Sequence, residues 1–375
     1  MKVLVTGGAG FIGTHLVRRL LGEGCSVTVL DNFNPQIHGE NRSLPVDLAP
    51  NVELQVGDVR DESAVARALR GQEVIVHLAA ETGTGQSMYE VLRYEDVNVK
   101  GTAVIIQALA NDKVKPPRKL VIASSRAVYG EGRYNCHIDG IVYPEARTVE
   151  DMQEGRFEPL CPICGATCEV QPTTEDSQLK PTSFYGLTKK MDEEMARLFA
   201  ETLGFSCVAL RYQNVYGPGQ SLKNPYTGIL GIFSNLARLH EPINIFEDGL
   251  ESRDFVFIND VVEATWTCIL DSTMKVETLN VGAGERVFVK DVAREIVNYF
   301  SSRSKLTITG TFRQGDIRHS IADIQKIRKL IMFQPKWSFS TGLRLYLDWV
   351  TSQELSQNCY DFSIHEMRER GLLHG

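Results

Sequence analysis

Short apolar runs and longer amphipathic stretches alternate through the first half of the 375-residue chain. The runs have the length of buried strands, and the amphipathic stretches repeat their apolar positions with a helical period. Strands are predicted near residues 3–6, 27–30, 52–56, 74–78, 118–124 and 207–211, and helices near 12–22, 61–70, 88–110 and 183–203. This order predicts an α/β fold, a doubly wound parallel sheet in which the loops after the strands ring one cleft.

The first predicted strand runs directly into a glycine-rich turn at the start of a helix. Gly7 permits a tight turn, Gly10 lets backbone N–H groups approach a pyrophosphate, and Gly13 brings helix and strand close together. The positive end of the helix dipole faces the same place. The pattern predicts a Rossmann-type site for a dinucleotide cofactor. The residues expected to contact the cofactor here are Gly7, Gly10, Phe11, Ile12 and Gly13.

Asp31 ends the second predicted strand, about 20 residues beyond the glycines, where an acidic residue can accept hydrogen bonds from both adenosine ribose hydroxyls. Its carboxylate repels a 2′-phosphate, and the next residues, 32–35, include no lysine or arginine. The site therefore favours NAD over NADP. The alternative is that Asp31 only satisfies the end of the strand.

The overall composition excludes several classes of protein. The chain has 40 basic against 47 acidic residues, a net charge of −7, and therefore no general affinity for nucleic acid or anionic membranes. No apolar stretch reaches the length of a membrane span, and the first strand starts at Lys2, which leaves no room for a targeting segment. We expect a cytoplasmic protein without nucleic-acid or membrane partners.

Tyr185 and Lys189 lie four residues apart in the predicted helix 183–203, and therefore on one face of it. A nearby ammonium and an oxidised nicotinamide both favour the phenolate form of a tyrosine. Such a phenolate can take a proton from a sugar hydroxyl while the carbinol hydrogen leaves as hydride. Alone, the pair is typical of a solvated helix face. The preceding dinucleotide motif makes a catalytic pair the better interpretation.

Ser125 follows the predicted strand 118–124, which places it at the rim of the cleft. Its hydroxyl can hydrogen-bond the reacting oxygen of a substrate. The alternative is that Ser124 and Ser125 only satisfy the end of the strand. With the tyrosine and lysine, the predicted catalytic set is Ser125, Tyr185 and Lys189.

The ordered set of motifs resembles the extended short-chain dehydrogenase/reductases of the NAD-dependent sugar epimerase/dehydratase family over nearly the whole chain. The matching segments are 6–13, Asp31, 57–59, 77–80, 98–102, Ser125 with 128–130, Tyr185 with Lys189, 211–218 and 253–256. The resemblance implies an NAD-binding domain over 1–212 and, over 213–375, mainly a smaller C-terminal substrate-binding domain with some segments returning to the first. It also implies a homodimer built on helices 88–110 and 183–203.

The same resemblance implies further binding residues. The cofactor set gains Asn32, Asp58, Val59, Leu78, Ala79, Ala80, Asn98, Tyr185 and Lys189, with Asp58 and Val59 at the adenine. The substrate set is Ser125, Arg126, Asn214, Arg253 and Arg318, with Asn214 and Arg253 at the diphosphate of a nucleotide sugar.

One difference from the family's pattern limits which reactions are expected. Dehydratase members carry an Asp-Glu pair directly after the catalytic serine or threonine, and here those positions are Arg126 and Ala127. We therefore expect a nucleotide-sugar 4-epimerase that oxidises and re-reduces the sugar with bound NAD. The alternatives are another nucleotide-hexose epimerase, for example of a UDP-sugar, a nucleotide-sugar reductase or dehydratase, and a catalytically silent NAD-binding regulatory protein.

Residues 131–180 break the α/β pattern and form an expected insertion, because a stretch this long and irregular is uncommon as a connection in a compact domain. Its cysteines at 136, 161, 164 and 168, together with segment 85–89, resemble the dTDP-L-rhamnose 4-epimerase-like subgroup of the family. The substrate implied is dTDP-L-rhamnose.

The segment Cys161-Pro-Ile-Cys164-Gly is typical of a zinc knuckle, in which a turn lets two thiolates converge on one ion. We expect a structural zinc held by Cys136, Cys161, Cys164 and Cys168, with His137 and Asp139 as alternatives for the fourth ligand. Such an ion would stabilise an insertion that has little core of its own. The other alternative is reduced cysteines without a metal.

Overall fold

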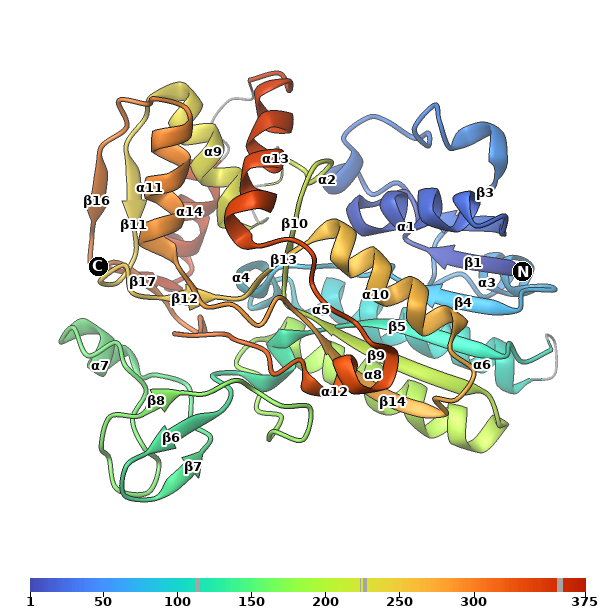
Figure 1. Cartoon of the computed structure of the whole chain (residues 1–375), viewed down its shortest axis with the longest axis horizontal. Helices are drawn as coiled ribbons and strands as arrows, with labels where there is room; N and C mark the ends of the chain where they lie inside the picture. The colour runs from blue at the N-terminus through green and yellow to red at the C-terminus, as the bar shows by residue number, and fades with distance from the viewer. Residues whose placement is uncertain (112–114, 223, 225–227, 356–359) are drawn as a thin grey trace.

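The structure is a computed structural model that describes residues 1–111, 115–222, 224, 228–355 and 360–375. A seven-stranded parallel sheet in the order β14-β9-β5-β4-β1-β2-β3 forms its centre (Figure 1). The strands are β1 (Lys2–Thr6), β2 (Ser26–Asp31), β3 (Val52–Val56), β4 (Val74–His77), β5 (Lys119–Ser125), β9 (Ser206–Tyr212) and β14 (Val276–Val281). The predicted doubly wound α/β fold is confirmed. Six strands lie within one residue of their predicted bounds, and β14 returns from the second half of the chain.

Alternate residues of the strands face two different layers of helices. In β1, Val3 and Val5 pack in one core with α1 (Phe11–Gly22) and α10 (Ile258–Leu270). Leu4 packs in the other core with the helices of the opposite face. Those helices are α3 (Glu62–Leu69), α6 (Gly101–Ala110) and α8 (Phe184–Leu203). The strand period of two thus builds both buried faces of the sheet.

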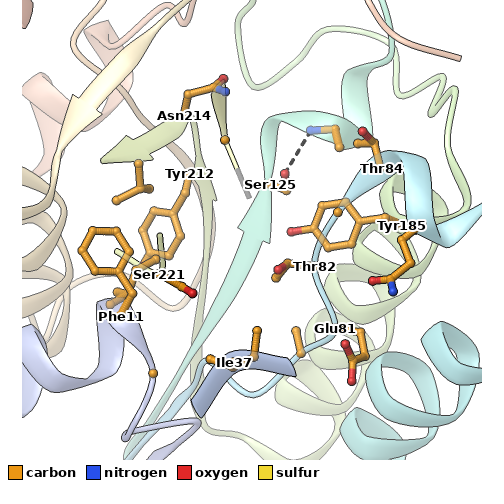
Figure 2. A pocket seen from close by; sticks show the side chains of 18 of the residues that line it. Phe11, Ile37, Glu81, Thr82, Thr84, Ser125, Tyr185, Tyr212, Asn214 and Ser221 are labelled. Carbon is orange, nitrogen blue, oxygen red and sulfur yellow. Dashed lines mark hydrogen bonds between the residues drawn. The ribbon is translucent and has the colours of Figure 1, made fainter. Parts of the chain in front are cut away.

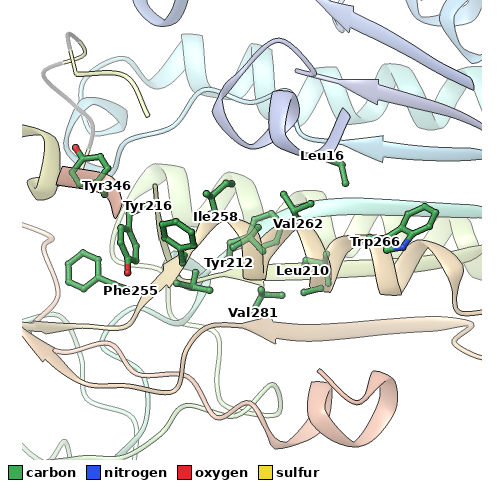
Figure 3. Close-up of a cluster of buried hydrophobic side chains, with 14 of the residues drawn as sticks. Leu16, Leu210, Tyr212, Tyr216, Phe255, Ile258, Val262, Trp266, Val281 and Tyr346 are labelled. Carbon is green, nitrogen blue, oxygen red and sulfur yellow. The ribbon is translucent and has the colours of Figure 1, made fainter. Parts of the chain in front are cut away.

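The first of these cores continues into the C-terminal part of the chain, where Tyr216, Phe255 and Tyr346 extend the row of sheet side chains (Figure 3). The elements of this part are β10 (Asn214–Tyr216), α9 (Ile229–Leu239), β11 (Ile243–Ile245), β12 (Ser252–Arg253), β13 (Phe255–Phe257), β15 (Val287–Phe288), α11 (Val289–Tyr299), β16 (Leu306–Ile308), β17 (Phe312–Arg313), α12 (Gln325–Ile331), α13 (Phe339–Thr351), α14 (Tyr360–Glu369) and β18 (Leu373–His374). A shared core fixes this part against the sheet.

The stretch predicted as one helix over 88–110 differs in the structure. It consists of α5 (Val91–Tyr94), a π-helical turn η2 (Glu95–Lys100) and α6. The buried Asn98 side chain in the π turn accepts from the Glu81 backbone N–H and donates to the Glu81 carbonyl and to Thr188 Oγ1. These tertiary hydrogen bonds accompany the wider turn, and single π turns of this kind inside α-helices are frequent at functional sites.

Residues 131–180 form the expected insertion, a small lobe at the lower left of Figure 1. It holds an antiparallel sheet in the order β7-β6-β8 and one short helix. Its elements are β6 (Tyr134–Cys136), β7 (Gly140–Val142), α7 (Val149–Gln153) and β8 (Glu169–Val170). Its own core is the cluster of Tyr134, Cys136, Val142, Cys161 and Cys168. So small a core gives little hydrophobic stabilisation.

The remaining short elements lie in connections around the sheet. They are α2 (Pro35–His38), η1 (Ala49–Asn51), α4 (Thr84–Ser87) and η3 (Arg126–Tyr129). None of the helices in the described part of the chain combines the length and the hydrophobicity that crossing a membrane requires.

Candidate active site

A cavity of about 540 Å³ opens along the carboxyl ends of the parallel strands. Its lining includes residues that follow β1, β2, β4, β5 and β9, as the strand order predicts. The volume lies within the range of small-molecule sites. The lining residues that the sequence singled out are Gly7, Gly10, Phe11, Ile12, Gly13, Asp31, Asn32, Val59, Leu78, Ala79, Ala80, Ser125, Arg126, Tyr185, Lys189, Asn214 and Arg253.

The glycine turn forms a cradle that side chains would fill. Gly7 has a φ of +68°, and a Cβ there would lie 2.7 Å from the backbone nitrogen of Ala79. A Cβ on Gly13 would lie 2.4 Å from the Gly7 carbonyl oxygen. Helix α1 starts after Gly10 without a side-chain cap. The first N–H groups of a helix have no partner within it, and here this end of α1 lines the cavity, so the turn fits the pyrophosphate of a dinucleotide.

The Asp31 carboxylate is held in place at the cavity wall by backbone donors. Its Oδ2 accepts from the Ala9 N–H at 3.0 Å and its Oδ1 from the Phe33 N–H at 2.9 Å. Each oxygen retains acceptor capacity for a ribose hydroxyl. The arrangement therefore fits the ribose of NAD.

Two residues expected at the cofactor lie behind the cavity wall. The Asp58 carboxylate binds Arg60 at 2.8 Å through both oxygens and accepts from Asn32 at 2.9 Å. The hydrogen bonds from Arg60 lower the pKa of Asp58 to about 2. Asn98 is fully buried in the π turn. Neither Asp58 nor Asn98 is among the residues that line the cavity; they support those that do.

Ser125 and Tyr185 come from different elements and meet in the cavity. Figure 2 shows the Tyr185 phenol extending into the cavity beside Ser125. Tyr185 lies in the first turn of α8, which Ser183 caps by accepting from the Gly186 N–H at 3.1 Å. A Cβ on Gly186 would lie 2.4 Å from the Ala127 carbonyl oxygen. Close contact at this glycine thus brings the tyrosine to the end of β5.

Lys189 lies one turn further along α8, also at the cavity. Its Nζ is 3.0 Å from Asp192 Oδ2, and both side chains are buried. Burial disfavours the ammonium, but the charges of Asp192 and Tyr185 outweigh it and raise the pKa of Lys189. Asp192 Oδ1 also accepts from Thr102 at 2.9 Å. The Lys189 side chain is therefore a protonated ammonium that Asp192 holds in position near the Tyr185 phenol.

The lining of the cavity also carries arginine side chains and a hydrogen-bond acceptor without a partner among the described residues. Asn214 Oδ1 is buried and has no hydrogen-bond partner among the described residues. Arg253 Nη2 is 3.2 Å from Asp316 Oδ1. Burial, with the nearby Arg253 charge, lowers the pKa of Arg126 to about 10, so it remains cationic at neutral pH. This part of the lining fits a diphosphate.

Several residues that line the cavity were not predicted, because nothing in the sequence pattern indicates that they bind a ligand. Arg313 is the last residue of β17, Asp316 lies in the irregular segment between β17 and α12, and Ser363 and Met367 come from α14. Burial opposes ionisation of Asp316, but Arg313, Arg253 and other arginines lower its pKa to about 2. Only the folded chain brings these segments to the cavity.

Arg318, expected to contact the substrate, does not line the cavity. Its guanidinium is completely buried and forms contacts of 2.7 Å with Glu158, Glu247 and Asp248. Its donors are therefore used within the protein. Arg313 contributes to the cavity wall from the same segment.

The insertion brings a group of metal-ligating side chains together away from the cavity. The group is Cys136, Asp139, Cys161 and Cys164, whose ligand atoms all lie within 4.8 Å of one another. Cys168, expected as the fourth ligand, lies outside this group, and its Sγ is 3.6 Å from the Ala166 carbonyl oxygen. Asp139, one of the alternatives that the sequence offers for the fourth ligand, belongs to the group instead.

Comparisons with known proteins agree with the fold and with the cavity. The chain matches the NAD dependent epimerase/dehydratase family over residues 3–147 and 161–282. A dTDP-L-rhamnose 4-epimerase of Burkholderia thailandensis is 38% identical over 359 residues, which cover 95% of this chain and 96% of that protein. The chain therefore belongs to the NAD-dependent epimerase/dehydratase family, as its motifs predict. The unmatched residues 148–160 lie in the insertion.

Solved structures give the same result. The UDP-glucose 4-epimerase of Thermotoga maritima with UDP-glucose has a TM-score of 0.74 and 28% identity, covering 94% of this chain and 99% of that one. The UDP-glucose 4-epimerase of Thermus thermophilus in complex with NAD has a TM-score of 0.74 and 26% identity, covering 94% and 100%. The family and the Rossmann-type fold are thus shown by sequence and by structure.

Proposed function

We propose that the protein is an NAD-dependent nucleotide-sugar 4-epimerase that interconverts dTDP-L-rhamnose and its C4 epimer. The observation that carries this proposal is that Ser125, Tyr185 and Lys189 line the same cavity as the glycine turn and Asp31. The similarity to the dTDP-L-rhamnose 4-epimerase of Burkholderia thailandensis supports the choice of sugar.

NAD, when bound, supplies an acceptor for the C4 hydrogen as hydride and later a donor for its return. The Tyr185 phenolate takes the proton from the C4 hydroxyl, and the Ser125 hydroxyl holds that oxygen. The Lys189 ammonium favours the phenolate by its charge. After the sugar presents its other face, Tyr185 returns the proton to the oxygen. The sugar is isomerised and no cofactor is consumed.

The cationic wall of the cavity is suited to the diphosphate of the substrate. Arg126, Arg253 and Arg313 offer charged donors, and Asn214 offers a side chain whose buried oxygen lacks a partner among the described residues. The tyrosine that handles the proton lines the same cavity. A nucleotide sugar bound by its diphosphate would therefore place its hexose near Ser125 and Tyr185.

The residues after Ser125 favour epimerisation over water elimination. Arg126 and Ala127 occupy positions where neither side chain can exchange a proton as a carboxyl group does. A 6-deoxy sugar has no hydroxyl at C6 to lose, so this substrate needs no such acid and base.

Proton NMR of the reaction tests this proposal. Enzyme incubated with dTDP-L-rhamnose and no added NADH should produce the C4 epimer, identified by the changed couplings of the ring proton at C4. A 4-keto-6-deoxy product from dTDP-glucose would instead identify a dehydratase. Faster epimerisation of a UDP-hexose than of dTDP-L-rhamnose would overturn the proposed substrate, but it would still support 4-epimerisation as the reaction.

A homodimer is part of the proposal, and an exposed apolar surface on α5 and α8 supports it. Leu92 is 82% exposed, and Leu187, Met191 and Leu198 are each at least 40% exposed. Apolar side chains grouped in this way are typical of protein interfaces. Light scattering should give a dimer for the wild type and a monomer for Leu92→Glu with Met191→Glu. A dimeric double variant would place the interface elsewhere.

We also propose a cytoplasmic location, which the seven free cysteines among the described residues support. Cell fractionation tests it. The zinc expected from the sequence belongs to the proposal as a structural ion of the insertion, outside the cavity.

A further inference from the structure

We infer that the insertion binds one zinc ion through Cys136, Cys161, Cys164 and Asp139, a site of three thiolates and one carboxylate. The inference goes beyond the proposed epimerase reaction and does not depend on it. None of the four residues lines the cavity.

The distances between the ligand atoms are those of a tetrahedral site. The Sγ atoms of Cys136 and Cys164 are 3.5 Å apart. Asp139 Oδ2 is 3.2 Å from the Cys161 Sγ and 3.6 Å from the Cys136 Sγ. Zinc bonds of about 2.3 Å to sulfur and about 2.0 Å to oxygen give tetrahedral edges of about 3.8 Å between sulfurs and about 3.5 Å between sulfur and oxygen. The group therefore needs only small shifts to enclose the ion.

Two separate turns hold these ligands in position. Cys136 pairs with Gly140 in the β6–β7 hairpin, so Asp139 lies in the hairpin turn. In the second turn, the Gly165 N–H donates to the Cys161 carbonyl at 2.9 Å and the Ile163 N–H donates to the Cys161 Sγ at 3.4 Å. An ion between the turns would join two segments that share only a small core. That is the role of a structural metal.

The donor set indicates which metal binds. Thiolates are soft ligands that favour zinc over magnesium or calcium. Four protein ligands leave no open position for a substrate, which is the pattern of a structural site. A disulfide between Cys136 and Cys164 is the competing state, but it requires the sulfurs to approach to about 2.05 Å.

Cys168 provides a matched control for the fourth ligand. It is as buried as the other cysteines of the small core and lies beside the Cys136 and Cys161 thiols, but its Sγ is 3.6 Å from the Ala166 carbonyl oxygen and falls outside the group whose ligand atoms all lie within 4.8 Å of one another. Its removal should therefore change packing and leave the ion bound.

The test uses the full chain, purified with reductant and reloaded with Zn²⁺ after chelation. Elemental analysis should give close to one zinc per chain. Competition with a chromogenic chelator should show at least tenfold weaker zinc binding for Cys161→Ala and Asp139→Ala, and wild-type binding for Cys168→Ala. NAD binding, measured in parallel, should stay unchanged in all three variants and shows that each is folded.

Cobalt substitution gives an independent count of the thiolates. The sulfur-to-cobalt charge-transfer band should fall by about a third in Cys161→Ala and keep its intensity in Asp139→Ala and Cys168→Ala. Loss of band intensity in Cys168→Ala, with wild-type zinc affinity in Asp139→Ala, would overturn the ligand set. A wild-type protein that takes up no zinc, with its cysteines either titrating as free thiols or joined in a disulfide, would overturn the site itself.

Discussion

Tyr185 depends on local contacts that a sequence pattern can indicate. The cap at Ser183 and the close approach at Gly186 place its phenol beside Ser125. Replacing Tyr185 with Phe keeps the ring and removes the proton acceptor. We predict that kcat falls by about 10²- to 10⁴-fold, roughly 3–5 kcal/mol, while NAD still binds by calorimetry.

Tyr212 supplies the control for this substitution. It also lines the cavity, but its hydroxyl bonds Thr265 at 2.8 Å in the core. Tyr212→Phe should retain a kcat within a few-fold of the wild type. An equal decrease of kcat in Tyr185→Phe and Tyr212→Phe would show that Tyr185 is not the proton acceptor.

The buried pair of Lys189 and Asp192 gives the reaction a pH dependence. The carboxylate, together with Tyr185, outweighs burial and raises the pKa of Lys189, so the ammonium persists to higher pH. Asp192→Asn removes that charge, and Lys189 then loses its proton at lower pH. The alkaline limb of the kcat profile should therefore move to lower pH. Asp192→Glu keeps the charge and should keep the limb closer to the wild type; an unmoved limb in Asp192→Asn would show that Lys189 does not set it.

Asp31 governs which dinucleotide binds. A 2′-phosphate would meet a carboxylate already fixed by the Ala9 and Phe33 N–H groups. We predict at least tenfold tighter binding of NAD than of NADP, and a smaller difference in Asp31→Asn, which keeps the shape and loses the charge. Equal affinities of the wild type for both cofactors would show that the ribose lies elsewhere.

The residues that the sequence could predict share a property: their role follows from neighbours within one turn or one strand. Gly13, Asp31 and Ser125 each lie at the end or start of a strongly patterned element. Asp316 could not be predicted, because its partner Arg253 is brought to it by tertiary packing. Asp192 was missed although its partner Lys189 lies three residues before it on the same helix, a spacing that could have indicated the pair. The irregular segment around Arg318 offered no period from which to tell which of its arginines faces the cavity.

At the scale of elements, the insertion connects to the substrate wall through Arg147. Its guanidinium binds Glu131 at 3.2 Å and Glu247 at 2.8 Å, and donates to the Asp316 carbonyl at 3.0 Å. Asp316 in turn binds Arg253 at the cavity. The side chain of Arg147 is almost fully buried, and its removal takes one donor from each of these acceptors, so that the buried Glu131 and Glu247 keep only their hydrogen bonds from Arg318.

We therefore predict that Arg147→Met raises the KM for the nucleotide sugar at least tenfold, with NAD affinity unchanged and kcat reduced less than KM is raised. Arg156 is the control, since it lies in the same insertion with its side chain 51% exposed and pairs with Asp151 and Glu154. Arg156→Met should leave KM unchanged. If both variants behave alike, the insertion does not position the substrate wall.

The broken helix at 91–110 shows where element prediction fails. Its apolar positions keep a helical period across η2, so the pattern gives no sign of the π turn. The turn accompanies hydrogen bonds that Asn98 donates to the Glu81 carbonyl and to Thr188 Oγ1, and one that it accepts from the Glu81 N–H, and these partners lie outside the helix. The sequence pattern predicted that this segment is helical, but it did not predict that a π turn interrupts the helix.

At the scale of the molecule, one core joins the sheet to the C-terminal part. The sequence predicts the parallel sheet and the edge where the loops meet, because alternating strands and helices allow few topologies. It does not predict that α14 contributes Ser363 and Met367 to the cavity, because a polar tail carries no pattern of burial. The site is assembled from both ends of the chain.

In the proposed reaction, one active site removes the hydrogen from C4 of the sugar and returns it to the same carbon. The most direct measurement uses dTDP-L-rhamnose carrying deuterium at C4, incubated with the enzyme in ordinary water without added NADH. NMR and mass spectrometry should then find the C4 epimer with its deuterium retained at C4. Loss of the deuterium to solvent, or a product that forms only when NADH is supplied, would contradict it.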